Sequence, residues 1–137
     1  MNPRRILTLA GVLMILLGLA RSAGGIVLLS QGAAADPSIR ASDATCAAVG
    51  GFLLALGAGL ILSAVGVLRR HRRAWLLGIG FTVAFVVDGM VNGYLLYGRP
   101  GDQGTVVNVV AATLILICLF AGAKALDAAG APKDVEP

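Results

Sequence analysis

Four long runs of apolar residues, separated by short polar segments, dominate the pattern of the chain. They cover about residues 6–29, 45–68, 75–97 and 105–124. About 20 consecutive apolar residues are enough to cross the hydrocarbon core of a bilayer as a helix, and each run reaches that length. The pattern therefore predicts an all-α membrane protein, a four-transmembrane-helix bundle within residues 1–125.

The polar segments indicate where the chain turns. Ser30–Asp43 is the longest of them, and an aspartate followed by proline, Asp36-Pro37, marks a turn within it. Ser42 or Asp43 is the expected N-cap of the second helix. Glycines in Gly98–Gly104 are typical of a tight turn. Residues 126–137 are small, polar and proline-containing, which predicts a disordered tail.

A cleaved signal peptide is the rival interpretation of the first run. Arg4 and Arg5 precede it, and Gly18–Ala20 resembles a cleavage site. Hydrophobicity resumes beyond that site, through Ile26–Leu29. We therefore expect an uncleaved spanning helix.

Composition agrees with a membrane environment. Of the 137 residues, 58% are hydrophobic and 13% are charged, whereas a soluble domain has about 25% charged residues. The formal net charge is +4, but most basic residues flank the apolar runs on one predicted side, and only Arg40 and Arg99 lie in the opposite loops. The members of the flanking set are Arg4, Arg5, Arg69, Arg70, Arg72, Arg73, Lys124 and Lys133. By the positive-inside rule this places both termini in the cytoplasm, in the cell (inner) membrane, and argues against nucleic acid as a partner.

The turn around His71 holds four arginines: Arg69, Arg70, Arg72 and Arg73. One interpretation is a docking patch for anionic headgroups of membrane lipids. The simpler one, which we favour, is a solvated anchor of the topology. Four neighbouring cations would repel a metal ion from His71, so we predict no metal site there.

Two ionisable residues lie inside apolar runs. Asp88 is near the middle of the third run and Arg21 is in the first. A charge at such depth costs roughly 2.5–3.5 kcal/mol on insertion scales, so it usually has a partner or a function. We expect the two to pair. The alternative for Arg21 is that its side chain reaches the outer headgroups.

Two asparagines complete the predicted intramembrane polar cluster. Asn92 follows Asp88 by four residues, within reach of a side-chain contact on one helix face. Asn108 lies near the start of the fourth run, where Thr105 resembles an N-cap, so Asn108 is also explained as a first-turn residue.

Small residues predict close helix packing, because they let backbones approach each other in lipid. One stripe lies in the first run and one in the second. The first consists of Gly11, Gly18 and Gly25, and the second of Gly51, Ala55, Gly59 and Ser63.

The two halves of the chain show signs of a duplication. An offset of 67 residues places Gly11 on Gly78 and Arg21 on Asp88. Such a repeat would make two parallel helical hairpins with Arg21 and Asp88 at matching depth. The second and fourth runs do not follow the offset.

Cysteine and histidine give no chemistry of their own. Cys46 and Cys118 are expected about 20 Å apart in depth at about 1.5 Å per residue, too far for a disulfide. We find no pattern for a metal, a cofactor or a nucleophile–base pair in the sequence, which disfavours an enzyme.

Two functions stay open. The first is a structural or accessory subunit, in a homo-oligomer or a larger membrane complex, with Arg21 and Asp88 fixing the helix arrangement. The second is a small proton- or cation-coupled transporter with Asp88 as the ion-binding acid.

Overall fold

The computed structural model describes residues 2–99, 103–124 and 126, and these contain helices and no strand. The elements are α1 (Pro3–Gln31), the short 3-10 helix η1 (Gly32–Ala35), α2 (Asp43–Leu68), α3 (Arg72–Tyr97) and α4 (Gln103–Gly122). All four apolar runs are thus confirmed as helices. The predicted tail beyond Leu126 and the middle of the predicted turn, residues 100–102, lie outside the described residues.

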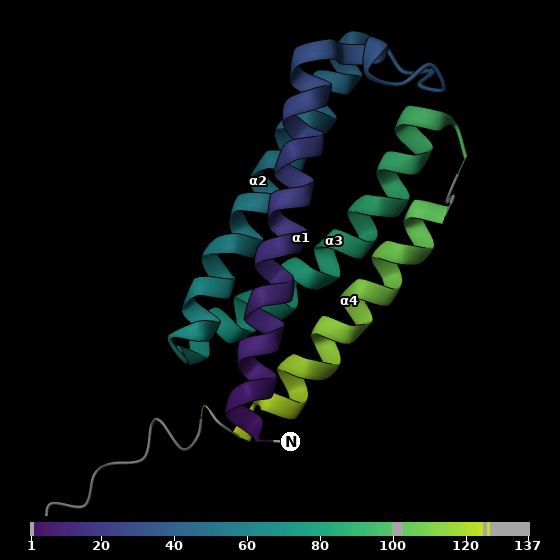
Figure 1. Cartoon of the computed structure of the whole chain (residues 1–137). Coiled ribbons are helices and arrows are strands. Elements are labelled where there is room, and N and C mark those ends of the chain that lie inside the picture. Colours follow the sequence, from purple (N-terminus) through teal and green to yellow (C-terminus); the bar gives the residue numbers. More distant parts are fainter. Residues whose placement is uncertain (1, 100–102, 125, 127–137) are drawn as a thin grey trace, which may run out of the picture.

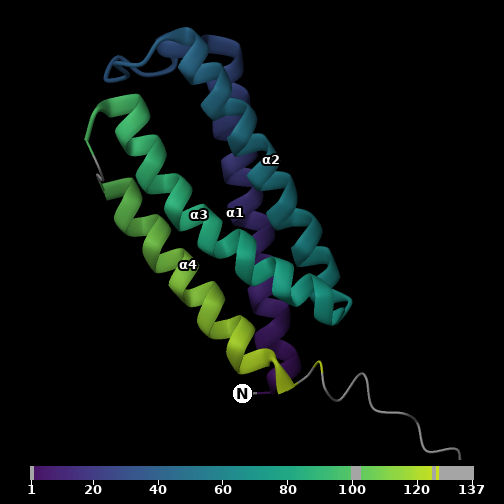
Figure 2. The ribbon, with the colours of Figure 1, turned by 180° about the vertical axis from the view of Figure 1, so that it is seen from behind.

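The four helices lie side by side and alternate in direction (Figure 1). α1 packs against α2 and α4, and α3 packs against the same two helices. α3 runs diagonally, from beside α2 at one end to beside α4 at the other, in both views (Figures 1 and 2). We call the end that holds the α2–α3 turn and the start of α1 the arginine end. The opposite end is the η1 end.

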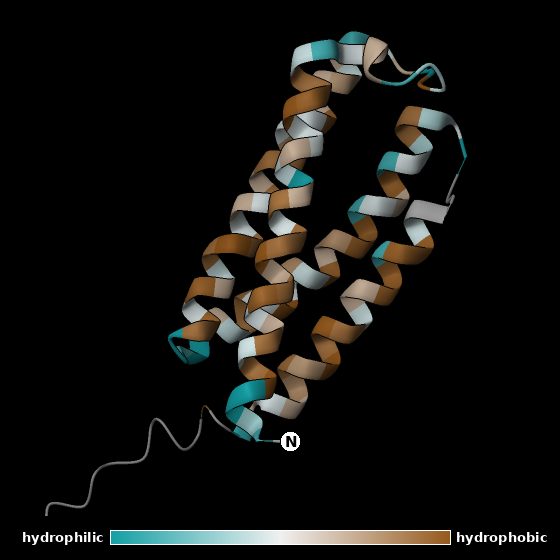
Figure 3. Ribbon diagram, viewed as in Figure 1, coloured by the Kyte–Doolittle hydropathy of each residue, from teal (hydrophilic) through white to brown (hydrophobic). Residues whose placement is uncertain are grey.

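Apolar side chains cover the outside of the helices as well as the core. Figure 3 shows hydrophobic residues along all four helices, with most hydrophilic ones at the two ends and a few within α1, α3 and α4. Leu62 is 73% exposed and Val107 is 65% exposed. All four helices are long and apolar enough to cross a membrane. The chain therefore has the architecture of a multi-pass membrane protein.

Glycines bring α1 and α2 into backbone contact. A Cβ atom added to Gly18 would lie 2.7 Å from the carbonyl oxygen of Gly57, and one added to Gly25 would lie 2.7 Å from that of Gly50. Real Cβ atoms do not approach so closely, so only glycine fits these positions. Gly11, Gly18 and Gly25 of α1, with Gly50, Gly57 and Ala64 of α2, form the contact that we call the glycine seam.

The predicted stripe on α2 is wrong as a single packing surface within the chain. Gly59 and Ser63 are buried, with Gly59 against the ring of Phe81 on α3. Gly51 and Ala55 are exposed, and a Cβ atom on Gly51 would meet nothing within 4 Å. A spacing of four residues turns about 40° per step around a helix, whereas a spacing of seven turns only about 20°. Four residues spaced by four therefore do not stay on one helix face, whereas the seven-residue spacing of the glycine seam keeps its residues on one face.

The segment between α1 and α2 folds onto the end of α3. Ser42 is the N-cap of α2, where its Oγ accepts a hydrogen bond from the Thr45 amide at 3.3 Å. Asp43 Oδ1 accepts one from the Ala33 amide at 2.9 Å. The Arg40 amide donates to the Leu96 carbonyl at 2.8 Å. These hydrogen bonds hold the loop over the η1 end. The loop is shorter than predicted, because α1 extends through Ser30 and Gln31.

At the arginine end, the α2–α3 turn closes with hydrogen bonds from the amides of Arg70 to Val67 and of His71 to Gly66, both at 2.9 Å. Arg70 has a φ of 60°, the left-handed conformation that commonly ends a helix. A core of large apolar side chains fills this end of the bundle; it includes Met14, Leu60, Phe85, Ile115 and Leu119. Phe85 therefore anchors α3 in this core.

Candidate functional site

Arg21 and Asp88 lie together in the middle of the helices. Arg21 Nη2 is 3.5 Å from Asp88 Oδ2, and their side chains are 18% and 1% exposed. The amide nitrogen of Asn92 donates a hydrogen bond to Asp88 Oδ1. The carboxylate is therefore approached by a cation from α1 and by an amide from its own helix.

Phe85 supports the guanidinium from below. The Arg21 Cζ atom lies 4.4 Å from the centroid of the Phe85 ring, and Phe85 is 1% exposed. A cation over an aromatic face gains about 0.5–2 kcal/mol, with the upper values at desolvated sites. Because Phe85, Asp88 and Asn92 follow one another at helical spacing, α3 presents all three on one face. Arg21 thus points inward to α3, not to the headgroups.

The polar cluster is not fully hydrogen-bonded. Arg21 Nε and Nη2 and Asp88 Oδ2 are buried and have no hydrogen-bond partner among the described residues. A buried polar group left without a partner costs about 1–3 kcal/mol. Arg21 therefore keeps donors that nothing in the described part of the chain satisfies.

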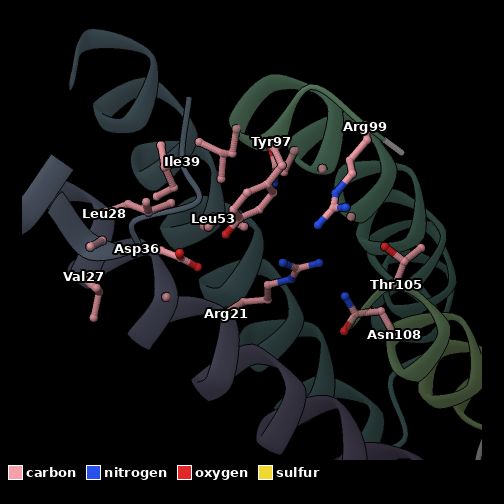
Figure 4. A pocket seen from close by; sticks show the side chains of 16 residues that line it. Arg21, Val27, Leu28, Asp36, Ile39, Leu53, Tyr97, Arg99, Thr105 and Asn108 are labelled. Atoms are coloured by element: carbon pink, nitrogen blue, oxygen red, sulfur yellow. The ribbon is translucent and has the colours of Figure 1, made fainter. Parts of the chain in front are cut away.

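A cavity of about 400 Å³ at the η1 end has Arg21 among its lining residues. It lies where α1 and α2 face α3 and the start of α4, and Figure 4 shows the side chains that surround it. Its polar lining residues are Arg21, Asp36, Asn92, Tyr97, Arg99, Thr105 and Asn108. The cavity has the size of a small-molecule site, for which about 300–1,000 Å³ is usual.

α4 contributes Thr105 and Asn108 to the cavity. The expectation that Thr105 is the N-cap is wrong, because α4 begins two residues earlier, at Gln103. Thr105 therefore lies inside the first turn. The positive end of the α4 dipole is at this cavity.

Asp36 lies on the loop side of the cavity. Its Oδ1 accepts hydrogen bonds from the Ser38 hydroxyl at 2.6 Å and the Ser38 amide at 2.8 Å. These bonds hold the pKa of the Asp36 carboxyl below its ordinary value, the hydroxyl contributing most. Asp36 is therefore ionised at neutral pH and forms an Asx turn that orders the loop.

A second hollow, of about 480 Å³, is an apolar groove between α2 and α3. Asp88 and Asn92 border it, together with residues such as Phe52, Val87 and Val91. In a bilayer this face lies against the hydrocarbon. The polar cluster thus lies between the cavity at the η1 end, which has polar and apolar lining residues, and a lipid-facing groove.

The structure brings together four of the residues that the sequence singled out. Arg21, Asp88 and Asn92 are in contact, and Asn108 shares the cavity with Arg21. The four arginines of the α2–α3 turn are exposed at the opposite end and do not take part. Sequence reasoning missed Arg99, which lines the cavity. The available signal was that Arg99 departs from the positive-inside pattern.

Metal and disulfide chemistry find no support in the part of the chain that the structure describes. It contains no group of three His, Cys, Asp or Glu residues able to hold a metal ion. Cys46 and Cys118 are both free thiols.

No family model, curated protein or solved structure matches this chain.

Proposed function

We propose that the protein is a structural or accessory subunit of a membrane assembly, and that the Arg21–Asp88 pair fixes the arrangement of its helices. The observation that supports this is the ion pair itself, which links α1 to α3 across the bundle. A buried ion pair is weak evidence of stability, but it can specify which helix faces meet.

An exposed surface of small residues supports a role in assembly. Gly51 and Ala55 lie on the outer face of α2, with open space beside Gly51. Small residues on a lipid-facing helix allow a second helix to approach closely. The partner is a second copy of this chain or another membrane subunit.

Cross-linking and light scattering in a mild detergent test this surface. The variant Gly51→Leu should reduce the fraction of oligomer or of copurifying subunit without changing the fold. Gly80→Leu on α3 is the matched control, because Gly80 also has nothing within 4 Å. Equal effects of the two substitutions would remove the support for an interface on α2.

Orientation in the membrane is part of the same proposal. The arginine end faces the cytoplasm, with both termini, because it carries Arg69, Arg70, Arg72 and Arg73. These arginines act as a solvated anchor of the topology, and a docking patch for anionic headgroups of membrane lipids is the alternative. In a cysteine-free background, a cysteine at position 71 should resist labelling from outside. External labelling there would reverse the orientation.

Transport is the second candidate, and the cavity is the observation that favours it. The cavity reaches Arg21, which is paired with Asp88, so an ion could approach the acid from the η1 end. The two candidates differ in what Asp88→Asn does. If the Asp88 carboxylate fixes the helix arrangement, its replacement by asparagine should lower the melting temperature.

An acid that couples transport to protons should instead leave assembly normal and lose its pH-dependent flux. Flux in liposomes of the parent protein, measured beside the melting curve of Asp88→Asn, separates the two. We expect destabilisation and no proton-coupled flux. Flux that disappears in a well-assembled Asp88→Asn variant would favour the transporter.

A further inference from the structure

We propose that the cavity at the η1 end binds a small organic carboxylate, whose charged group is held by Arg21, Arg99 and Asn108. This inference goes beyond the proposed function and does not depend on it. It rests on the charged and polar side chains that converge on the cavity and on its apolar wall.

Hydrogen-bond donors gather on one side of the cavity. Figure 4 shows the side chains of Arg21 and Arg99 extending into it, with the Asn108 amide close by. The two guanidinium groups repel each other across the same space, and an anion between them would relieve that repulsion and accept hydrogen bonds from them.

Two carboxylates close to the cavity argue against a doubly charged ligand. Arg21 and Arg99 face the cavity, Asp36 lies across it, and Asp88 already pairs with Arg21 from behind. A dianion such as a phosphate monoester would meet two nearby carboxylates. A monocarboxylate would meet fewer unfavourable contacts and matches the forked geometry of arginine.

Apolar residues complete the lining and indicate an organic ligand. Val27, Leu28, Leu53 and Leu96 supply a hydrophobic wall. The volume of about 400 Å³ accommodates a short acyl chain or a ring as well as the carboxylate. Because Asp36 and Ile39 of the loop also line the cavity, it opens at the polar end of the bundle. A water-soluble ligand therefore fits better than a membrane lipid.

Calorimetric titration of the full chain in dodecylmaltoside with hexanoate tests the proposal. Hexanamide has the same shape without the charge and should bind much more weakly. Arg99→Gln should weaken hexanoate binding at least about tenfold, because it removes a charged donor. Arg40→Gln is the matched control: Arg40 is exposed at the same end and is not part of the lining. It should leave binding unchanged.

Asp36→Asn adds a test of sign. It removes a negative charge across from the bound carboxylate, so it should tighten hexanoate binding. Arg99 is exposed, and neither Arg99→Gln nor Asp36→Asn changes the Arg21–Asp88 pair. Both variants should therefore keep the melting temperature of the parent protein. Melting curves of both check this.

Several results would overturn the proposal. Equal binding of hexanoate and hexanamide would mean that the cavity selects apolar ligands only. Equal losses in Arg99→Gln and Arg40→Gln would mean a general effect of surface charge. Absence of saturable hexanoate binding would mean that water alone fills the cavity. Retention of phosphatidylglycerol that depends on Arg99, without hexanoate binding, would assign the site to a lipid headgroup.

Discussion

α1 contacts its neighbour α2 and the more distant α3 in opposite ways. Against α2 it places glycines, and backbone lies directly on backbone at Gly18–Gly57 and Gly25–Gly50. Toward α3 it extends a long cation, with Arg21 Nη2 3.5 Å from Asp88 Oδ2 and buried donors without a hydrogen-bond partner among the described residues. The first contact is tight and apolar, and the second is open and borders a cavity.

This difference separates two tasks of helix packing in a membrane. Apolar burial gives little drive in lipid, so the glycine seam holds α1 and α2 together by close van der Waals contact. The polar cluster adds less stability, since desolvation offsets most of its attraction. It determines instead which face of α3 meets α1, and its position leaves room for a ligand at the η1 end.

The largest loss of stability is expected when a large side chain is added in the glycine seam. Gly57→Leu would place a side chain against the Gly18 carbonyl and Ser22, where backbone cannot move aside. We expect a loss of more than about 4–5 kcal/mol in the free energy of unfolding, or no folded protein at all. Gly51→Leu, six residues away in open space, is the control. A folded Gly57→Leu with the parent melting temperature would show that α1 and α2 do not need this approach.

Removing one partner of the Arg21–Asp88 pair should cause a smaller loss of stability. Asp88→Ala leaves the Arg21 cation buried without its counter-charge, which should cost about 3–5 kcal/mol. Unfolding in detergent, followed by circular dichroism, gives the value. A loss below about 1 kcal/mol would mean that Arg21 finds water or another partner as good as the carboxylate.

Double substitution measures how far the two charges depend on each other. Removing Arg21 together with Asp88 should cost less than the sum of the two single alanine substitutions, by about 1–3 kcal/mol. The same detergent unfolding applied to the four proteins of the cycle supplies this coupling energy. Additive losses would show that the two charges act independently. The ion pair would then not determine which face of α3 meets α1.

The smallest expected effect lies at the end of the seam itself. Gly11 faces the flexible tip of Leu68, with a Cβ atom 2.7 Å from its Cδ2, whereas Gly18 faces a carbonyl. Leu68 can rotate away, so Gly11→Ala should cost less than about 1 kcal/mol, while Gly18→Ala should cost about 1–3 kcal/mol. Equal melting temperatures for the two variants would mean that the seam is uniformly soft.

The sequence by itself determined the four spanning helices, because a bilayer accepts a hydrophobic helix by length and composition alone. It also brought Arg21 and Asp88 forward as a pair, since a charge at that depth is costly without a partner. Asn92 followed from its helical spacing to Asp88. These features depend on local pattern, on period and on the cost of burying charge.

Tertiary structure alone decided which faces of the helices meet. Small residues lie on several faces of α2, and only its crossing with α1 selects Gly50 and Gly57 rather than Gly51 and Ala55. The cavity likewise depends on the diagonal path of α3, which brings Arg99 into the same space as Arg21 (Figure 4). Residues 78 positions apart share that space because of how rigid helices cross, and a one-dimensional pattern carries no record of crossing angles.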